Sequence, residues 1–335
     1  MDNLENMDWE ELPPLPDNTD ELKTIRKSLR KRSTATVLTC FLLAAALILS
    51  VFGAEKLFLH PGSNTLGIEY SNDLSMAMIA YSELFTPSQT VTGMTYEKTG
   101  FASYSLSVQM YENYAMTDAT YPSATLKRSK LEFPMGFWTW ESANVFTRAS
   151  YPVYNLSEEY KQEIRERLEQ LPDYILVRGR VSFPEDLTMA ELLEFRDSLK
   201  DGYIGWVGIR NAPEDQQCYP LCGMKPFVGG YVWDQMNENY PCFDLYTQET
   251  NAENLETHFK SLLQLSLDQY NAGTGIDPGW NLYENYYEGV LNYVEENGVM
   301  TYGCYVVGSP ELFLKLLDSG TASQVWLQDA WIDVG

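Results

Sequence analysis

The clearest pattern along this chain is an uninterrupted run of apolar residues near its amino terminus. Residues 35–54 read ATVLTCFLLAAALILSVFGA and contain no charged side chain. A helix of this length spans roughly 30 Å, which is the thickness of the hydrocarbon core of a bilayer. Helices of soluble proteins keep a polar face, so the run predicts a transmembrane helix over 35–54 and not a buried core helix.

The charges on either side of this run predict its orientation. Residues 23–32, KTIRKSLRKR, hold six basic side chains in ten, whereas Lys56 is the only basic residue close to the other end. Basic flanks stay in the cytoplasm and attract anionic lipid. We therefore expect a cytoplasmic tail over 1–34, a single pass through the cell membrane and an extracytoplasmic remainder. A cleaved signal peptide is disfavoured by the long, initially acidic leader and by Phe52, which lies where a small residue is needed.

Beyond the span, the hydrophobic pattern first favours strands. Residues 94–117 alternate weakly between apolar and polar positions, and a second strand-rich stretch covers 127–149. Residues 55–150 are therefore predicted to form a β-rich membrane-proximal region. A separate C-terminal αβ domain is predicted over 151–335.

Within 151–335, helical and strand patterns alternate, and several helices carry start and stop signals. Alternation of this kind favours a mixed α+β domain with helices layered over a sheet. The predicted helices are 155–171, 184–199, 252–270, 281–297 and 310–319, and the predicted strands are 174–183, 203–211, 301–308 and 323–333. The predicted signals are capping boxes at Asn155–Glu158 and Thr188–Glu191, an N-cap at Ser309 before Pro310, and terminal glycines at Gly298 and Gly320.

The net charge of the chain limits the kinds of partner that it can bind. Its 335 residues include 47 acidic and 23 basic side chains, for a net charge of −24. Residues 1–32 hold 8 acidic and 6 basic residues, so most of the acidity belongs to the extracytoplasmic part. Direct binding of nucleic acid requires clustered Lys and Arg on a surface, so nucleic acid is not expected as a partner.

Four cysteines fall in the predicted extracytoplasmic part: Cys218, Cys222, Cys242 and Cys304. An even number outside the cell is compatible with disulfides, and the spacing leaves all three pairings open. Free thiols are the alternative. A metal site is disfavoured because C-x3-C lacks the usual spacing and no histidine lies nearby.

Motifs of hydrolases, metalloproteases and phosphate-binding loops do not occur in the sequence. Of the two histidines, His258 lies on a predicted helix and is interpreted as a surface or boundary residue. Aromatic clusters such as FWTW are interpreted as core packing. The chain is therefore predicted not to be an enzyme and to hold no cofactor and no metal ion.

The C-terminal part resembles the C-terminal domain of bacterial sigma factor regulators, which are membrane-bound anti-sigma factors of extracytoplasmic-function sigma factors. The resemblance covers about 174–335. It lies in VRGRVSFPEDLTMAELLEF with its Ser182–Phe183 pair, in YIGWVGIRN, and in YGCYVVGSPELFLKLLDS with a turn at Gly308. A cysteine-bearing insertion over about 212–250 departs from the family pattern.

This resemblance implies a regulator that holds an extracytoplasmic-function sigma factor at the membrane and releases it under envelope stress. The cytoplasmic tail would then bind the sigma factor, with large apolar side chains set among acidic ones as anchors. The expected anchors are Trp9, Leu12, Leu15, Ile25 and Leu29. The alternative is a membrane-anchored module that binds an extracytoplasmic ligand or envelope component and has no role with a sigma factor.

Overall fold

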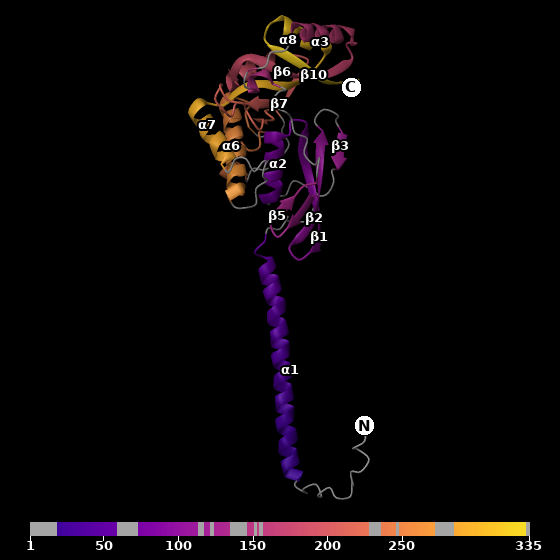
Figure 1. Cartoon of the computed structure of the whole chain (residues 1–335), viewed down its shortest axis with the longest axis vertical. Coiled ribbons are helices and arrows are strands. Elements are labelled where there is room, and N and C mark those ends of the chain that lie inside the picture. The colour runs from indigo at the N-terminus through magenta and orange to yellow at the C-terminus, as the bar shows by residue number, and fades with distance from the viewer. Residues whose placement is uncertain are drawn as a thin grey trace, which may run out of the picture. The chain divides into compact units, whose positions relative to one another are not determined.

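The computed structural model has an α+β fold, as predicted, in which residues 1–58 and 59–335 form two compact units (Figure 1). We call them the α1 unit and the C-terminal unit. The structure describes residues 19–58, 73–112, 117–120, 124–134, 146–150, 153, 157–227, 236–245, 248–271 and 285–332.

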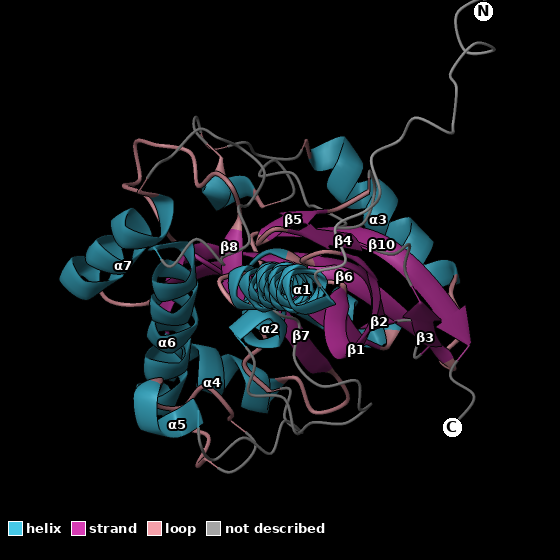
Figure 2. Ribbon diagram, turned by 90° about the horizontal axis from the view of Figure 1, so that it is seen from below, coloured by secondary structure: helices cyan, strands magenta, loops and turns pink. Residues whose placement is uncertain are grey.

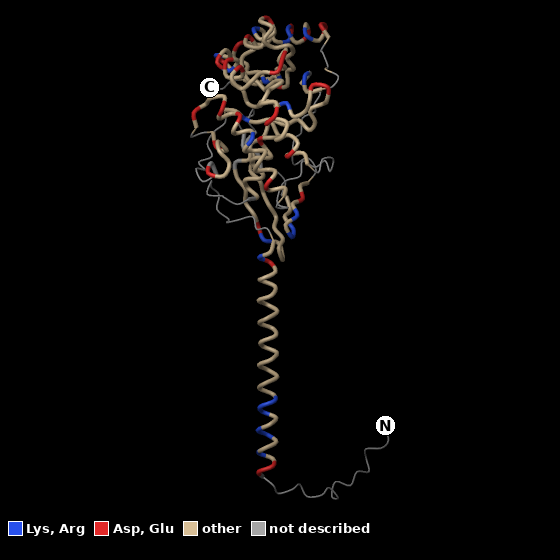
Figure 3. The backbone as a smooth tube through the Cα atoms, turned by 90° about the vertical axis from the view of Figure 1, so that its left-hand side faces the viewer, with Lys and Arg blue, Asp and Glu red and all other residues tan. Residues whose placement is uncertain are grey.

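The α1 unit is one continuous helix, α1 (Thr19–Glu55), of 37 residues. It begins 16 residues before the predicted span because the basic segment ahead of that span is rich in Lys, Arg and Leu, which are good helix formers. Figure 3 shows that the Lys and Arg residues of α1 lie in its amino-terminal half and are followed by an uncharged stretch. Among the described residues, α1 is the one helix long and apolar enough to cross a membrane.

The first sheet of the C-terminal unit consists of antiparallel strands that are close in sequence, in a region where the weak alternation predicted strands. Their order is β1-β2-β4-β5, and β3 pairs with the far end of β2. The strands are β1 (Gln89–Gly100), β2 (Ser103–Glu112), β3 (Thr117–Thr120), β4 (Ala124–Lys127) and β5 (Lys130–Glu132).

The second sheet has the order β10-β6-β9-β7-β8, and each of its neighbouring pairs is antiparallel. Its strands are β6 (Ile175–Thr188), β7 (Tyr203–Ile209), β8 (Cys222–Met224), β9 (Met300–Gly308) and β10 (Gln324–Ile332). The last strand of the chain thus lies at one edge, beside the first strand of the sheet. Figure 2 shows the helices arranged around the strands of this unit.

The described part of the chain around the second sheet also holds helices that lie where the sequence predicted them, except that the helix at 236–239 was not predicted and that residues 184–188 of the predicted helix 184–199 belong to β6. The helices are α3 (Glu158–Gln170), α4 (Met189–Ser198), α5 (Met236–Asn239), α6 (Ala252–Asn271), α7 (Tyr286–Asn297) and α8 (Pro310–Asp318). The capping box of Thr188 and Glu191 is confirmed, and so is the Ser309 cap with Pro310 in the first turn. The predicted start of α3 was wrong: its N-cap is Ser157, whose hydroxyl accepts from the Tyr160 amide, and Asn155 lies outside the described residues.

Side chains of different character cover the two faces of this sheet. Val177, Val181 and Phe183 of β6 belong to an extended core with the helices. Gly179 permits the close approach of α8, because a Cβ atom there would lie 2.6 Å from the Phe313 ring. A second cluster is largely aromatic and gathers Phe146, Trp206, Tyr302 and Tyr305 with segments 146–149 and 218–221.

Helix α2 (Asp73–Phe85) was not predicted, and it links the two predicted regions of the C-terminal unit. Its side chains are buried from Leu74 to Phe85. It packs against β1 of the first sheet and against β8 and α6 of the second. The predicted boundary at 150/151 therefore falls between the two sheets but within one compact unit.

Candidate functional site

The predicted partner-binding residues fall partly within the described chain. Trp9, Leu12 and Leu15 lie outside the described residues. Ile25 and Leu29 lie on α1 with 54% and 58% of their surface exposed. Both side chains are therefore available to a partner.

Leu22 extends these two residues into an apolar stripe that the sequence reading missed. It precedes Ile25 by three positions and Leu29 by seven, so the three side chains share one face of α1. Leu22 is 52% exposed. Lys23, Lys27 and Lys31 follow a different row about 100–180° around the same helix. Arg26 lies four positions after Leu22 and Arg32 three after Leu29, so basic side chains also flank the stripe on its own face. The spacing of Leu22, Ile25 and Leu29 was the signal that could have identified Leu22.

All four cysteines predicted to lie outside the membrane are free thiols in the structure. Cys222 lies on β8 opposite Ile209, and Cys304 lies on β9 opposite Val207. Because β7 separates these strands, their backbones lie two strand spacings apart, roughly 9.5 Å. That exceeds the Cα separation of about 7 Å beyond which a disulfide cannot form, so this fold excludes a Cys222–Cys304 bridge.

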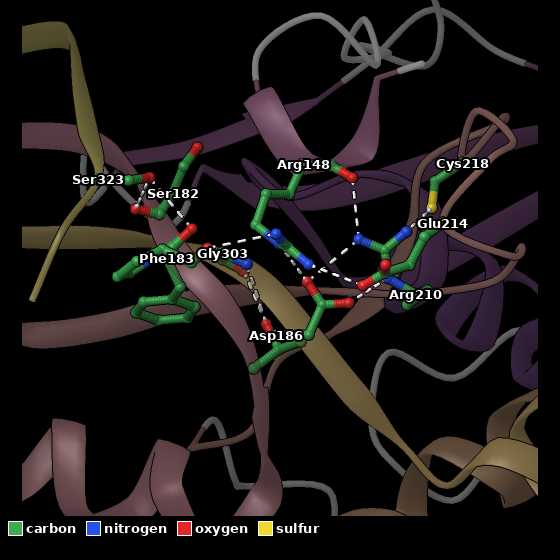
Figure 4. A network of polar contacts seen from close by, with 11 residues as sticks. Arg148, Ser182, Phe183, Asp186, Arg210, Glu214, Cys218, Gly303 and Ser323 are labelled. Atoms are coloured by element: carbon green, nitrogen blue, oxygen red, sulfur yellow. Dashed lines mark hydrogen bonds and ion pairs between the residues drawn. The ribbon is translucent and has the colours of Figure 1, made fainter. Parts of the chain in front are cut away.

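The most extensive polar network joins three segments that are distant in sequence (Figure 4). Asp186 of β6 accepts from Arg148 Nε at 2.8 Å and from Arg210 Nη2 at 3.1 Å, and Arg210 Nε contacts its other oxygen. Arg148 lies in a 3-10 turn, η3 (Thr147–Ala149), and Arg210 directly follows β7. Arg210 Nη2 also donates to the Arg148 carbonyl at 2.9 Å. The network thus fixes the 146–150 segment against the second sheet.

The charges of this network are held permanently. Burial alone would raise the pKa of Asp186, but hydrogen bonds from Arg210 and Arg148 outweigh it, so the pKa is lowered. Burial would likewise lower the pKa of Arg210, but the bond to Asp186 raises it. Neither group changes protonation near neutral pH, which makes the network unsuited to general acid–base catalysis.

Cys218 lies at the edge of this network. Arg210 Nη1 approaches its sulfur at 3.8 Å, and the Cys218 amide donates to the Ala149 carbonyl at 2.9 Å. Burial raises the pKa of the Cys218 thiol, so the reactive thiolate is disfavoured. These contacts give Cys218 a packing role beside Arg210.

His258 belongs to a second buried polar group, so its predicted position at the surface or boundary was wrong. This residue was expected at the surface or boundary, but it is 2% exposed. Its Nε2 lies 3.1 Å from Glu83 Oε2, and its Nδ1 lies 2.9 Å from the Cys242 carbonyl oxygen. The reason is the unpredicted helix α2, which brings Glu83 against α6.

Two further side chains satisfy backbone groups at the carboxyl end of α2. Lys225 Nζ donates to the Ser82 carbonyl at 3.4 Å and contacts the Gln89 carbonyl oxygen. Trp206 Nε1 donates to the Glu83 carbonyl at 2.8 Å. Helix carbonyls at this end have no partner within the helix, and a cation there is favoured by the helix dipole. Burial lowers the pKa of Lys225 to about 8, although the charge of Glu83 opposes this change.

The buried polar side chains described above hold segments of the fold together. Across the described part of the chain, no group of three or more His, Cys, Asp or Glu side chains is arranged to hold a metal ion. Asp186, Arg210, Glu83 and Lys225 are each at least nine-tenths buried and bonded to other parts of the fold.

Comparisons with models of protein families, with curated proteins and with solved structures find no match.

Proposed function

We propose that this chain is a single-pass membrane regulator with a cytoplasmic tail over 1–34 and an extracytoplasmic C-terminal unit. The observation that carries the proposal is the composition of α1, in which the six basic residues of 23–32 directly precede the uncharged stretch 33–54 on one helix. Large apolar side chains along that run are exposed, including Phe41, Leu47 and Leu49 at 67–70%. Hydrocarbon is the environment that suits such a surface, and the basic flank stays in the cytoplasm.

The tail is proposed to bind an extracytoplasmic-function sigma factor, as the resemblance of residues 174–335 implies. Sigma factors bind DNA and therefore carry basic surface, which the acidic side chains of residues 2–21 complement. Trp9, Leu12 and Leu15 would serve as apolar anchors, and the exposed stripe with Ile25 and Leu29 would extend the contact along α1. Large apolar side chains among charged ones are typical of interface hot spots.

The C-terminal unit is proposed to detect the state of the envelope. Asp186, Arg210, Glu83 and Lys225 are buried and bonded to other parts of the fold, which supports a structural role for these groups. A folded unit connected to the tail by a single helix fits the proposed transmembrane regulator.

The test is recovery of a partner by the cytoplasmic tail. A peptide of residues 1–34, immobilised through its carboxyl end, is expected to retain a sigma factor from a lysate of host cells. The peptide with Trp9, Leu12 and Leu15 replaced by alanine is expected to lose at least tenfold in affinity, because three buried anchors at about 1–2 kcal/mol each are removed.

Two controls make this test specific. A scrambled 1–18 sequence joined to native 19–34 keeps the composition and charge, and it should retain no sigma factor. If the native and scrambled peptides recover the same proteins, the sigma factor role is wrong. The alternative of a membrane-anchored binding module then remains.

A further inference from the structure

The basic residues of the first-sheet region gather at one end of that sheet. Residues 59–147 contain eight acidic residues and four basic ones. All four basic side chains lie at or beside two turns, the β1–β2 turn and the β4–β5 turn. They are Lys98, Lys127, Arg128 and Lys130, and each of them is exposed.

Strand register brings the two turns together. Ser103 of β2 pairs with Gly100 of β1 on one side and with Lys127 of β4 on the other. The Arg128 amide donates to the Ala102 carbonyl at 2.7 Å, which joins one turn directly to the next. The end of β1, the start of β2, the end of β4 and the start of β5 thus meet at one end of the first sheet (Figure 1).

An exposed aromatic side chain stands within this basic group. Phe101 occupies the β1–β2 turn and is 42% exposed. Lys130 has a long contact of 3.9 Å with Glu132 at the surface, whereas Lys127 and Arg128 meet no carboxylate among the described residues. We call Lys98, Phe101, Lys127, Arg128 and Lys130 the basic end.

The backbone of the β4–β5 turn is strained at the residues that display the charge. Arg128 has φ 50° and Ser129 has φ 66°, so both lie in the left-handed region. Two-residue turns of this kind prefer Asn-Gly or Asp-Gly, because other residues pay a steric cost there. An arginine at such a position is a conformational outlier, which points to a role for its side chain.

We propose that the basic end binds the anionic phospholipid headgroups of the membrane that α1 crosses. The C-terminal unit holds 38 acidic and 16 basic residues, a net charge of −22, so an anionic surface repels most of it. The positive charges of the basic end would instead be attracted to anionic headgroups. The exposed Phe101 ring beside them suits the boundary between headgroups and acyl chains. Attachment to α1 keeps the unit at high local concentration beside the bilayer, so a weak contact suffices.

This inference rests on the proposed membrane anchoring by α1, and the experiment tests the two separately. The full chain is reconstituted in nanodiscs of phosphatidylcholine and phosphatidylglycerol that are doped with a headgroup-photoactivatable anionic phospholipid. Cross-linked peptides are identified by mass spectrometry. We expect cross-links at residues 98–103 and 127–130, reduced at least fivefold when 0.5 M salt screens the charges.

A variant that preserves the turn removes the charge. The variant replaces the three lysines of the basic end through Lys98→Gln, Lys127→Gln and Lys130→Gln. It also carries Arg128→Asn and Ser129→Gly, which together supply the Asn-Gly pair that the turn geometry favours. The matched control removes the same charge from the helices α3 and α8 through Lys161→Gln, Arg165→Gln, Arg167→Gln and Lys315→Gln. We expect at least fivefold fewer cross-links for the first variant and no loss for the control.

The outcomes separate the two proposals. Failure of the chain to enter nanodiscs through α1 would overturn the membrane anchoring itself. Stable insertion with cross-links that are absent from the two turns, or unchanged by neutralising them, would overturn the role of the basic end alone. Equal loss in the charge-matched control would do the same, because the effect would then follow from net charge and not from this surface.

Discussion

Asp186 joins three segments of the C-terminal unit, so its carboxylate should matter more to stability than most surface charges. Asp186→Asn removes the negative charge that lies between Arg148 and Arg210. Loss of one partner from a buried ion pair typically costs about 3–5 kcal/mol, because the other charge remains buried. We expect the free energy of unfolding in urea to fall by about 3 kcal/mol.

Glu214 provides the control for this prediction within the same network. It accepts from Arg148 at 3.0 Å, but its side chain is 78% exposed. Exposed ion pairs contribute about 0–1 kcal/mol, so Glu214→Gln should change stability little. Equal effects of the two substitutions would contradict the assignment of Asp186 as the centre of the network.

The lowered pKa of the buried Lys225 side chain leads us to expect that the stability of the fold depends on pH. Burial lowers its pKa to about 8 in the folded chain, against an ordinary value near 10.5 in the unfolded chain. Between these values the unfolded state binds more protons, so stability rises with pH, and the penalty of burying the ammonium group is fully present below pH 8.

The measurement compares the native chain with Lys225→Met, which fills similar space without titrating. The difference in unfolding free energy should shift in favour of the native chain by up to about 1.4 kcal/mol per pH unit between pH 8 and 10. A flat difference across this range would show that Lys225 does not titrate there.

At the scale of single elements, the β4–β5 turn offers a prediction in the stabilising direction. Arg128→Asn with Ser129→Gly relieves the steric strain at two residues in the left-handed region. The melting temperature should therefore rise, and the free energy of unfolding should increase by about 1 kcal/mol. Circular dichroism melts test this directly. A turn that is destabilised by Asn-Gly would contradict the observed geometry and remove the strain argument for the basic end.

Elements with local signals were predicted correctly, and those that depend on distant partners were not. The caps of α4 at Thr188 and of α8 at Ser309 followed from side chains within four residues, whereas the predicted helical start at 184 was wrong because 184–188 continue β6. Helix α2 was missed because nearly every side chain in it is buried, which leaves no polar face to mark a helical period. The start of α3 was misplaced by two residues because Asn155 and Ser157 are both suitable caps.

The arrangement of the whole molecule was predictable only in outline. The apolar run and the alternation of helices and strands indicated a possible span and an α+β unit. The order β10-β6-β9-β7-β8 was not accessible, because β6 pairs with strands more than 110 residues later in the chain. The Arg148–Asp186–Arg210 network was missed for the same reason, since its members are ordinary charged residues until folding brings them together.

The proposed function assigns different tasks to the two units: α1 would cross the membrane and the tail ahead of it would hold a partner, while the C-terminal unit is folded around buried ion pairs. The most direct test of the central claim is the cellular distribution of the extracytoplasmic-function sigma factor in the presence of the full chain. Residues 1–18 are replaced by their scrambled sequence, which leaves the basic flank and α1 intact.

Quantitative immunoblotting of membrane and soluble fractions is the measurement. The account predicts that the sigma factor is enriched in the membrane fraction with the native chain and moves to the soluble fraction with the scrambled tail, while transcription from its promoters rises. An unchanged distribution and unchanged transcription, with both chains inserted at equal levels, would contradict the regulator function.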